Sequence, residues 1–284
     1  MTALESIADN LRRWPIFPGA ILALLVICGV FAPYMAPRDP VQASLRARNT
    51  PPVWAAKGSA KYLLGADQQG RDVLSRVIYG ARVSLVVAGV ALGIGGLVGT
   101  VLGMISGYFG GWVDEIVMRL IDIMLAVPLI LIALVVVIVM GQSMTVLIAI
   151  LAINAWSGFA RQARAEVLQL KTMDYVSMAK VSGASSLRIL YQHIFPGVVS
   201  TIIIVGTLQV GNLILTEAIL SFLGAGIPPP MPSWGSMVFD GRTYLGSAWW
   251  IAFFPGISIF LTVLAFNFLG DWLRDHLDPR LRQS

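Results

Sequence analysis

Six long apolar runs constrain this sequence more than any other feature. They occupy about residues 16–36, 83–106, 119–140, 143–160, 198–223 and 248–270. Apart from Arg119 at the edge of the third run, none of them contains lysine or arginine. A helix needs about 20 apolar residues to cross the hydrocarbon core of a bilayer. The pattern therefore predicts an all-α polytopic membrane protein with six transmembrane helices.

The composition excludes several other classes of protein. Of the 284 residues, 57% are hydrophobic and only 12% are charged, whereas soluble domains carry about 25% charged residues. This excludes an ordinary soluble domain, a disordered chain and a nucleic-acid-binding domain. Cys28 is the single cysteine, so no internal disulfide can form. His193 and His276 are too few and too far apart for a metal site, and we expect no bound metal.

The runs divide the chain into three parts. Residues 1–80 hold the first helix and a polar loop, 81–270 form a core with the other five helices, and 271–284 form a tail. Apolar residues at helical spacing over 72–82 predict a short amphipathic helix on the membrane surface, or a plain connector. Lysine and arginine number 11 on the side of the termini and nine on the other. Charge alone therefore leaves the orientation open.

Two features of the runs concern the packing of helices. The second run carries a row of glycines spaced four residues apart, namely Gly95, Gly99, Gly103 and Gly107. This spacing places them on one helix face, where the lack of side chains lets another helix approach closely. A flexible hinge is the alternative interpretation. In the third run, Pro128 is expected to kink the helix.

The few polar side chains inside the runs are candidates for a transport pathway or gate. Those of the fifth run are Gln209, Asn212, Glu217 and Ser221. A carboxylate within a membrane is costly and usually faces a partner or a wet cavity. Glu217 is therefore expected either to line a pathway or to form a hydrogen bond between helices.

The segment 161–196, between the fourth and fifth runs, has the pattern of a protruding helical element. Thr172 or Asp174 can cap a short helix that continues to about Val181. Gly183 is expected to end that helix, because glycine is the usual residue just after a helix C-terminus.

A second short helix is expected after this break. Ser185 can cap it, its apolar residues recur at helical spacing, and Pro196 is expected to stop it before the fifth run. A helix, a glycine break and a helix suit docking into a groove on another protein. An amphipathic hairpin resting on the membrane is the alternative.

The chain lacks the motifs of ATP binding and of hydrolysis. A phosphate-binding G-x-x-x-x-G-K-[ST] loop is absent, because Leu170 precedes Lys171 and Thr172 where glycine is required. Neither H-E-x-x-H nor G-x-S-x-G occurs. We therefore expect no enzyme, and any transport against a gradient would be driven by an ion gradient or by another subunit.

Four segments resemble the ABC-importer permeases of the dipeptide, oligopeptide and nickel family, and in particular the C-type permease of each pair. Residues 174–196 resemble the cytoplasmic "EAA" loop, with Ser177-Met178-Ala179 in place of Glu-Ala-Ala and with Gly183 retained. Residues 64–85, LGADQQGRDVLSRVIYGARVSL, resemble the entry to the permease core. The two remaining segments, 217–235 and 264–281, carry further motifs of the same family.

The resemblance implies the fold and the partners of a type I ABC importer. Both termini would lie in the cytoplasm of a bacterial cell, with the six helices in its inner membrane. The implied partners are a second homologous permease, two ATPase subunits or one fused ATPase chain, and an extracytoplasmic substrate-binding protein. ATP and Mg²⁺ would bind the ATPases, and this chain would hold no cofactor.

In such an importer, the segment 161–196 would be the coupling loop that contacts the ATPase. The implied contact residues are Asp174, Tyr175, Val176, Ser177, Met178, Ala179, Gly183, Ala184, Ser185 and Arg188. The implied function is to form half of a translocation pathway for di- or oligopeptides. Import of nickel or another small solute is the alternative within the family. A stand-alone secondary transporter or channel, and a membrane scaffold or enzyme, are the alternatives outside it.

Overall fold

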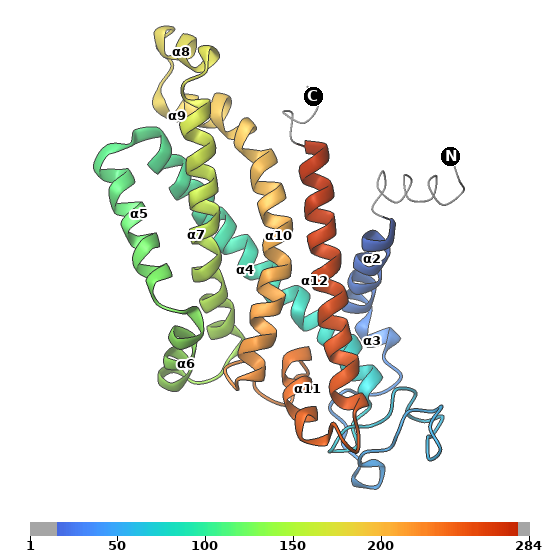
Figure 1. The fold of residues 1–284 in the computed structure, drawn as a ribbon. Helices are drawn as coiled ribbons and strands as arrows, with labels where there is room; N and C mark the ends of the chain where they lie inside the picture. The colour runs from blue at the N-terminus through green and yellow to red at the C-terminus, as the bar shows by residue number, and fades with distance from the viewer. Residues whose placement is uncertain (1–15, 278–284) are drawn as a thin grey trace, which may run out of the picture.

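The computed structural model describes residues 16–277, and this part of the chain folds into helices without a β-strand. The helices are α2 (Ile16–Val30), α3 (Ala32–Met35), η1 (Leu45–Ala47), α4 (Val73–Phe109), α5 (Gly111–Ala126), α6 (Leu129–Met140), α7 (Met144–Leu170), α8 (Asp174–Val181), α9 (Ser186–Arg188), the π-helix η2 (Ile189–Ile194), α10 (Phe195–Phe222), α11 (Trp234–Gly241), η3 (Arg242–Tyr244) and α12 (Trp250–Leu277). Figure 1 shows α8 protruding at one end of the bundle, which we call the tip. At the other end lie α11 and the loop that precedes α4, and we call this the base.

The all-α membrane class is confirmed by the length and hydropathy of these helices. Four helices of the described residues are long and apolar enough to cross a membrane: α4, α7, α12 and the continuous helix Ser186–Phe222, which includes α10. The bent pair α5 and α6 adds a fifth crossing if it counts as one span. Helix α2 is apolar but has only 15 residues, fewer than the usual 20. Six crossings need both additions, so that count stays a prediction.

The amphipathic helix expected over 72–82 is not a separate element. It forms the first turns of α4, a single helix of 37 residues. Asp72 caps this helix by accepting a hydrogen bond from the Ser75 amide. The prediction of a surface helix was wrong because Val73 and Ala81 are buried against Trp234 and Trp250. These apolar residues face protein rather than the membrane surface.

The single helix expected over 119–140 is also corrected. Two helices occupy this region, α5 and α6, and they meet at an angle of 82°. The break lies at Val127, an extended residue that directly precedes Pro128. A proline disfavours helical geometry at the residue before it and provides no N–H for the helix. The proline therefore breaks the span instead of only kinking it.

The glycine row of α4 lies directly against the backbone of α7. A Cβ atom on Gly95 would come within 2.6 Å of the Ala152 carbonyl oxygen. At Gly99 and Gly103 the added Cβ would overlap a carbonyl oxygen of α7. Gly107 is closest to the Arg164 carbonyl, at 3.0 Å. The two helices thus approach to backbone contact over three turns, which favours the packing interpretation over the hinge.

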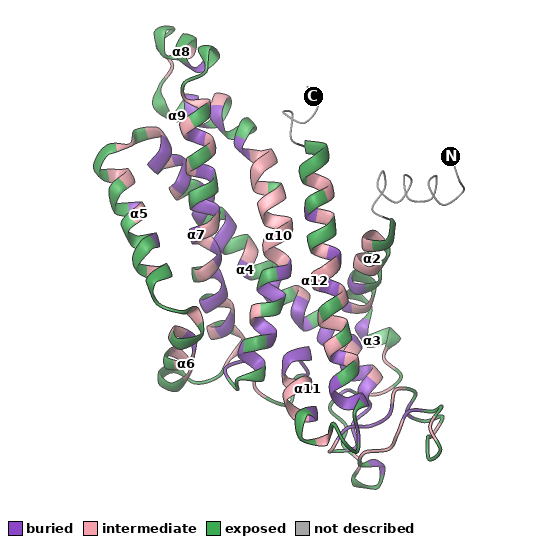
Figure 2. Cartoon of the chain, viewed as in Figure 1, coloured by how far each residue is buried: buried purple, intermediate pink, exposed green. Residues whose placement is uncertain are grey.

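The interior of the bundle is apolar and lies among α4, α7 and α10. Its buried residues include Val87 of α4, Leu151 of α7 and Leu213 of α10. Figure 2 shows buried residues where these helices face one another, whereas α5 is mostly exposed. Side chains such as Ile138 of α6 are apolar and exposed, as expected for surfaces that face lipid. The core therefore positions both the tip and the base.

Replacing Gly99 by alanine is expected to destabilise the protein by about 3 kcal/mol, the upper end for overpacking, because the obstacle is backbone rather than a movable side chain. Gly93 is the matched control, since nothing lies within 4 Å of its added Cβ. Gly93→Ala should leave the melting temperature unchanged or slightly higher. Thermal unfolding in detergent measures both variants, and equal melting temperatures would contradict the packing interpretation.

Candidate functional site

The tip is held to the bundle by a small apolar cluster. Val176 is the buried residue of α8, and it packs with Met104 of α4, Val167 of α7 and Ile194 of the π-helix. Ala179 and Ala184 are half-buried against the same cluster. The short helix α8 is therefore fixed to the ends of three long helices and does not hang from a flexible loop.

The outer face of the tip exposes an unusual number of apolar side chains. Those that are exposed are Met173, Tyr175, Met178, Val181, Leu187 and Tyr191. Val181 and Met178 are the extreme cases of α8, at 90% and 69% exposure. The expected contact residues Asp174, Ser177, Gly183, Ser185 and Arg188 are exposed on the same element. A protruding face of mixed apolar and charged residues is typical of a contact with another protein or with a membrane surface.

Gly183 ends α8 in the way that the sequence predicts. Its φ is +80°, a left-handed conformation that side chains other than glycine rarely adopt. The Gly183 amide donates to the Lys180 carbonyl and the Ala184 amide to the Ala179 carbonyl, each at 3.0 Å. These two bonds form a Schellman motif, which satisfies the free carbonyls at the end of the helix.

Three details of the expected coupling loop are corrected. Helix α7 continues to Leu170, so the loop is shorter than 161–196. The N-cap of α8 is Met173, without a side-chain hydrogen bond, and Asp174 lies in the first turn. Pro196 does not stop a helix. It lies in the first turn of α10, directly after the π-helix η2, and the helix continues through it from Ser186 to Phe222.

An ion pair between α7 and α5 stabilises the end of the bundle next to the tip. Arg164 of α7 donates through two nitrogens to the carboxylate of Asp114 in α5, at 2.5 and 2.6 Å. Ser106 of α4 donates to the same carboxylate. Lys171, at the end of α7, donates to the Gly107 carbonyl of α4 at 2.7 Å. These bonds join α4, α5 and α7 next to α8.

The four candidate pathway residues of α10 fall into two pairs. Glu217 is 1% exposed, and Ser221 donates to one of its oxygens at 2.7 Å. The other oxygen, Oε2, is buried without a hydrogen-bond partner among the described residues. Asn212 is exposed and donates to half-buried Gln209 at 3.3 Å. Only Glu217 and Ser221 therefore face the interior.

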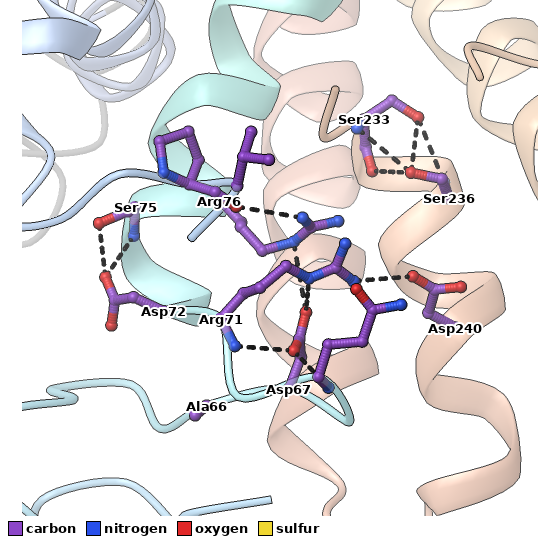
Figure 3. Close-up of polar contacts among 12 residues, drawn as sticks. Ala66, Asp67, Arg71, Asp72, Ser75, Arg76, Ser233, Ser236 and Asp240 are labelled. Atoms are coloured by element: carbon purple, nitrogen blue, oxygen red, sulfur yellow. Dashed lines mark hydrogen bonds and ion pairs between the residues drawn. The ribbon is translucent and has the colours of Figure 1, made fainter. Parts of the chain in front are cut away.

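A cluster of four charged residues at the base was not among the candidates from the sequence. Asp67 accepts from Arg71 Nε at 2.6 Å and lies 3.6 Å from Arg76 Nε. Arg71 also reaches Asp240 of α11 at 3.4 Å. Figure 3 shows the two guanidinium groups side by side, between Asp67 and Asp240. The charged residues within the motif 64–85 could have indicated part of this cluster, but Asp240 of α11 lies 169 residues from Arg71 in sequence.

Comparisons with known proteins identify the family. Residues 99–283 match the family described as binding-protein-dependent transport system inner membrane component. The dipeptide transport system permease protein of Escherichia coli K12 is 44% identical over 100% of this chain and 95% of its own length. The di/tripeptide transport system permease protein of Pseudomonas aeruginosa UCBPP-PA14 is 39% identical over 93% of this chain and 87% of its own length.

Two further similarities extend this result. The glutathione transport system permease protein of Pectobacterium atrosepticum is 42% identical over 93% of this chain and 86% of its own length. A chain of the MetNI methionine ABC transporter has a similar fold, with a TM-score of 0.59 over 72% of this chain and 96% of that chain. At 16% sequence identity, this last match concerns the fold alone.

Truncating Arg71 to alanine is expected to cost about 3 kcal/mol, because it leaves the Asp67 carboxylate buried with a weaker partner. Arg119 is the matched control. Its pair with Glu115 is exposed on both sides and 3.8 Å long, so Arg119→Ala should change stability by less than about 1 kcal/mol. Denaturant unfolding in detergent compares the two variants. Equal effects would show that the cluster at the base is not stabilising.

Proposed function

Because this chain belongs to the family of binding-protein-dependent transport system inner membrane components, we propose that it forms half of the translocation pathway of an ABC importer for di- or oligopeptides. The observation that carries the peptide assignment is the similarity, along nearly the whole chain, to relatives named for dipeptide and di/tripeptide transport. The relative named for glutathione transport supports the same chemistry, since glutathione is itself a small peptide. Import of another small solute is the second candidate.

The energy for transport is supplied from outside this chain. The sequence has no phosphate-binding loop, so two ATPase subunits, or one fused chain, bind ATP and Mg²⁺. A second, homologous permease completes the pathway, and an extracytoplasmic binding protein delivers the peptide. This chain is a non-catalytic membrane subunit.

The tip is the element that receives the work of the ATPases. Its exposed apolar residues, such as Met178 and Val181, dock in a groove of an ATPase. Its buried anchor Val176 and the pair of Arg164 with Asp114 make the connection to the long helices stiff. Closure of the ATPases on ATP then shifts the bundle from inward-facing to outward-facing. Such a shift requires contacts that differ between the two states.

The tip therefore lies in the cytoplasm, and the base faces the opposite side of the membrane. Helix α12 ends on the side of the tip, and α2 begins toward that side (Figure 1). Both termini are then cytoplasmic. Along the pathway, Glu217 and Ser221 are the interior polar groups of α10 and act as a gate or lining.

The decisive experiment is reconstitution. The chain, purified with its second permease and ATPases, is placed in liposomes with the substrate-binding protein outside. ATP inside should drive the uptake of a labelled dipeptide. Uptake by this chain alone, following an ion gradient, would contradict the proposal and favour a secondary transporter.

A cysteine at position 181 should crosslink to an ATPase subunit. Val181 is the most exposed apolar residue of α8, and Cys28→Ser removes the only native thiol. Leu45→Cys is the matched control, since this residue is 84% exposed in η1, within the loop at the base. A bifunctional thiol reagent and gel electrophoresis detect the product. Crosslinking from position 45 but not from 181 would place the base, and not the tip, in the cytoplasm.

Substituting Gly183 by valine should uncouple ATP hydrolysis from uptake. A β-branched residue at φ +80° costs roughly 1–2 kcal/mol and distorts the end of α8. Gly183→Asn is the control, because asparagine tolerates this conformation. The measured quantity is ATP hydrolysed per peptide imported, which should rise several-fold for valine and little for asparagine. Equal ratios in both variants and the native protein would count against the coupling role.

A further inference from the structure

A small cavity at the base is lined by both arginines of the charged cluster. Its volume is about 170 Å³, below the 300–1,000 Å³ of typical small-molecule pockets. It therefore suits one end of a ligand. Its polar lining comes from Arg71, Arg76, Gln142, Ser221, Ser236 and Asp240. Ser221 is also the hydrogen-bond donor to Glu217, so the cavity adjoins the proposed gate.

Both arginines are buried, and each has unused hydrogen-bonding capacity. They are 5% and 3% exposed for Arg71 and Arg76. Arg71 uses Nε on Asp67 and Nη2 on Asp240. Arg76 faces Asp67 with Nε and donates from Nη1 to the Pro40 carbonyl at 3.2 Å. Neither Nη1 of Arg71 nor Nη2 of Arg76 has an acceptor among residues 16–277.

The two guanidinium groups are held in place before any ligand arrives. Both lie against one oxygen of Asp67, at 2.6 and 3.6 Å. Asp67 is itself fixed, because its other oxygen accepts from the amides of Gln69 and Arg71. Gly70, with φ +73°, closes this turn against Ser44, where a Cβ would overlap the backbone. The unused nitrogens therefore belong to a rigid arrangement.

The charges of the cluster select the kind of group that the cavity can take. Two arginines face two aspartates, so the four side chains have no net charge. A multiply charged anion such as phosphate would be poorly compensated. A single carboxylate matches adjacent guanidinium N–H donors, which bind carboxylates with short, charge-assisted hydrogen bonds.

We propose that this cavity binds the C-terminal carboxylate of a peptide in transit, through Arg71 and Arg76. The inference rests on the proposed function as a peptide importer, and it adds where this chain recognises the peptide. Arg76 is the residue to test, because Asp67 keeps Arg71 as its closer partner when Arg76 is replaced.

The test measures direct binding of Gly-Phe to the purified importer in nanodiscs without the binding protein, by saturation-transfer NMR. N-acetyl-Gly-Phe should bind like Gly-Phe, whereas Gly-Phe amide should bind about tenfold more weakly. Arg76→Gln should weaken the binding of Gly-Phe to the level of Gly-Phe amide and leave the binding of the amide unchanged. Arg76→Lys keeps the charge but lacks the planar guanidinium group, and it should give an intermediate loss of Gly-Phe affinity. Arg46→Gln, an exposed arginine of the loop before α4, is the matched control and should change nothing.

Assembly of the complex and its ATP hydrolysis show that each variant is folded. If ATP-driven dipeptide uptake is present in the native importer but Arg76→Gln leaves the preference for the free carboxylate intact, the inference fails and the proposed function stands. If uptake itself is absent, the proposed function fails. Docking of the binding protein to the same nanodiscs is measured separately. If Arg76→Gln weakens this docking but leaves Gly-Phe binding unchanged, an acidic side chain of that partner occupies the cavity, and the inference is again overturned.

Discussion

The close approach of α4 and α7 is the contact on which the rest of the structure depends. In a bilayer, helices gain little from hydrophobic burial, because lipid tails are as apolar as leucine. Van der Waals contact must supply the attraction instead, and it is strongest where backbones touch. Gly95, Gly99, Gly103 and Gly107 allow that contact along three turns. The helices so joined carry the tip at one end and the charged cluster at the other.

Helix α4 is the physical connection between the two ends. With 37 residues it is about 55 Å long, well beyond the roughly 30 Å core of a bilayer. In its last turns, the Gly107 carbonyl accepts a hydrogen bond from Lys171, and the ring of Tyr108 lies under the ammonium group of Lys180. Its first turn follows the N-cap Asp72 and contains Arg76 of the charged cluster. A displacement imposed at the tip is therefore transmitted to the base through one stiff element.

Charged groups at both ends are paired within the protein. Asp114 with Arg164 braces the tip, and Asp67 with Arg71 braces the base. The pair at the base is buried, and breaking it is costly because it leaves a charge without compensation. The pair at the tip is partly exposed. Such pairs keep each end rigid. Exposed apolar side chains at the tip and unused arginine N–H groups at the base are then available for contacts with partners and substrate.

The sequence by itself determined the membrane class, the apolar helices, the glycine end of α8 and the family resemblance. These features are local. Hydropathy indicates whether a segment lies in lipid or in water, and residue spacing indicates which side chains share a helix face, both without information about distant residues. Tertiary structure alone decided that residues 72–82 continue into α4, that the helix from Ser186 continues through Pro196, and that the span at Pro128 breaks by 82°. It also brought Arg71 to Asp240, 169 residues away. Which charges pair depends on packing between helices, and no local pattern in the chain records that packing.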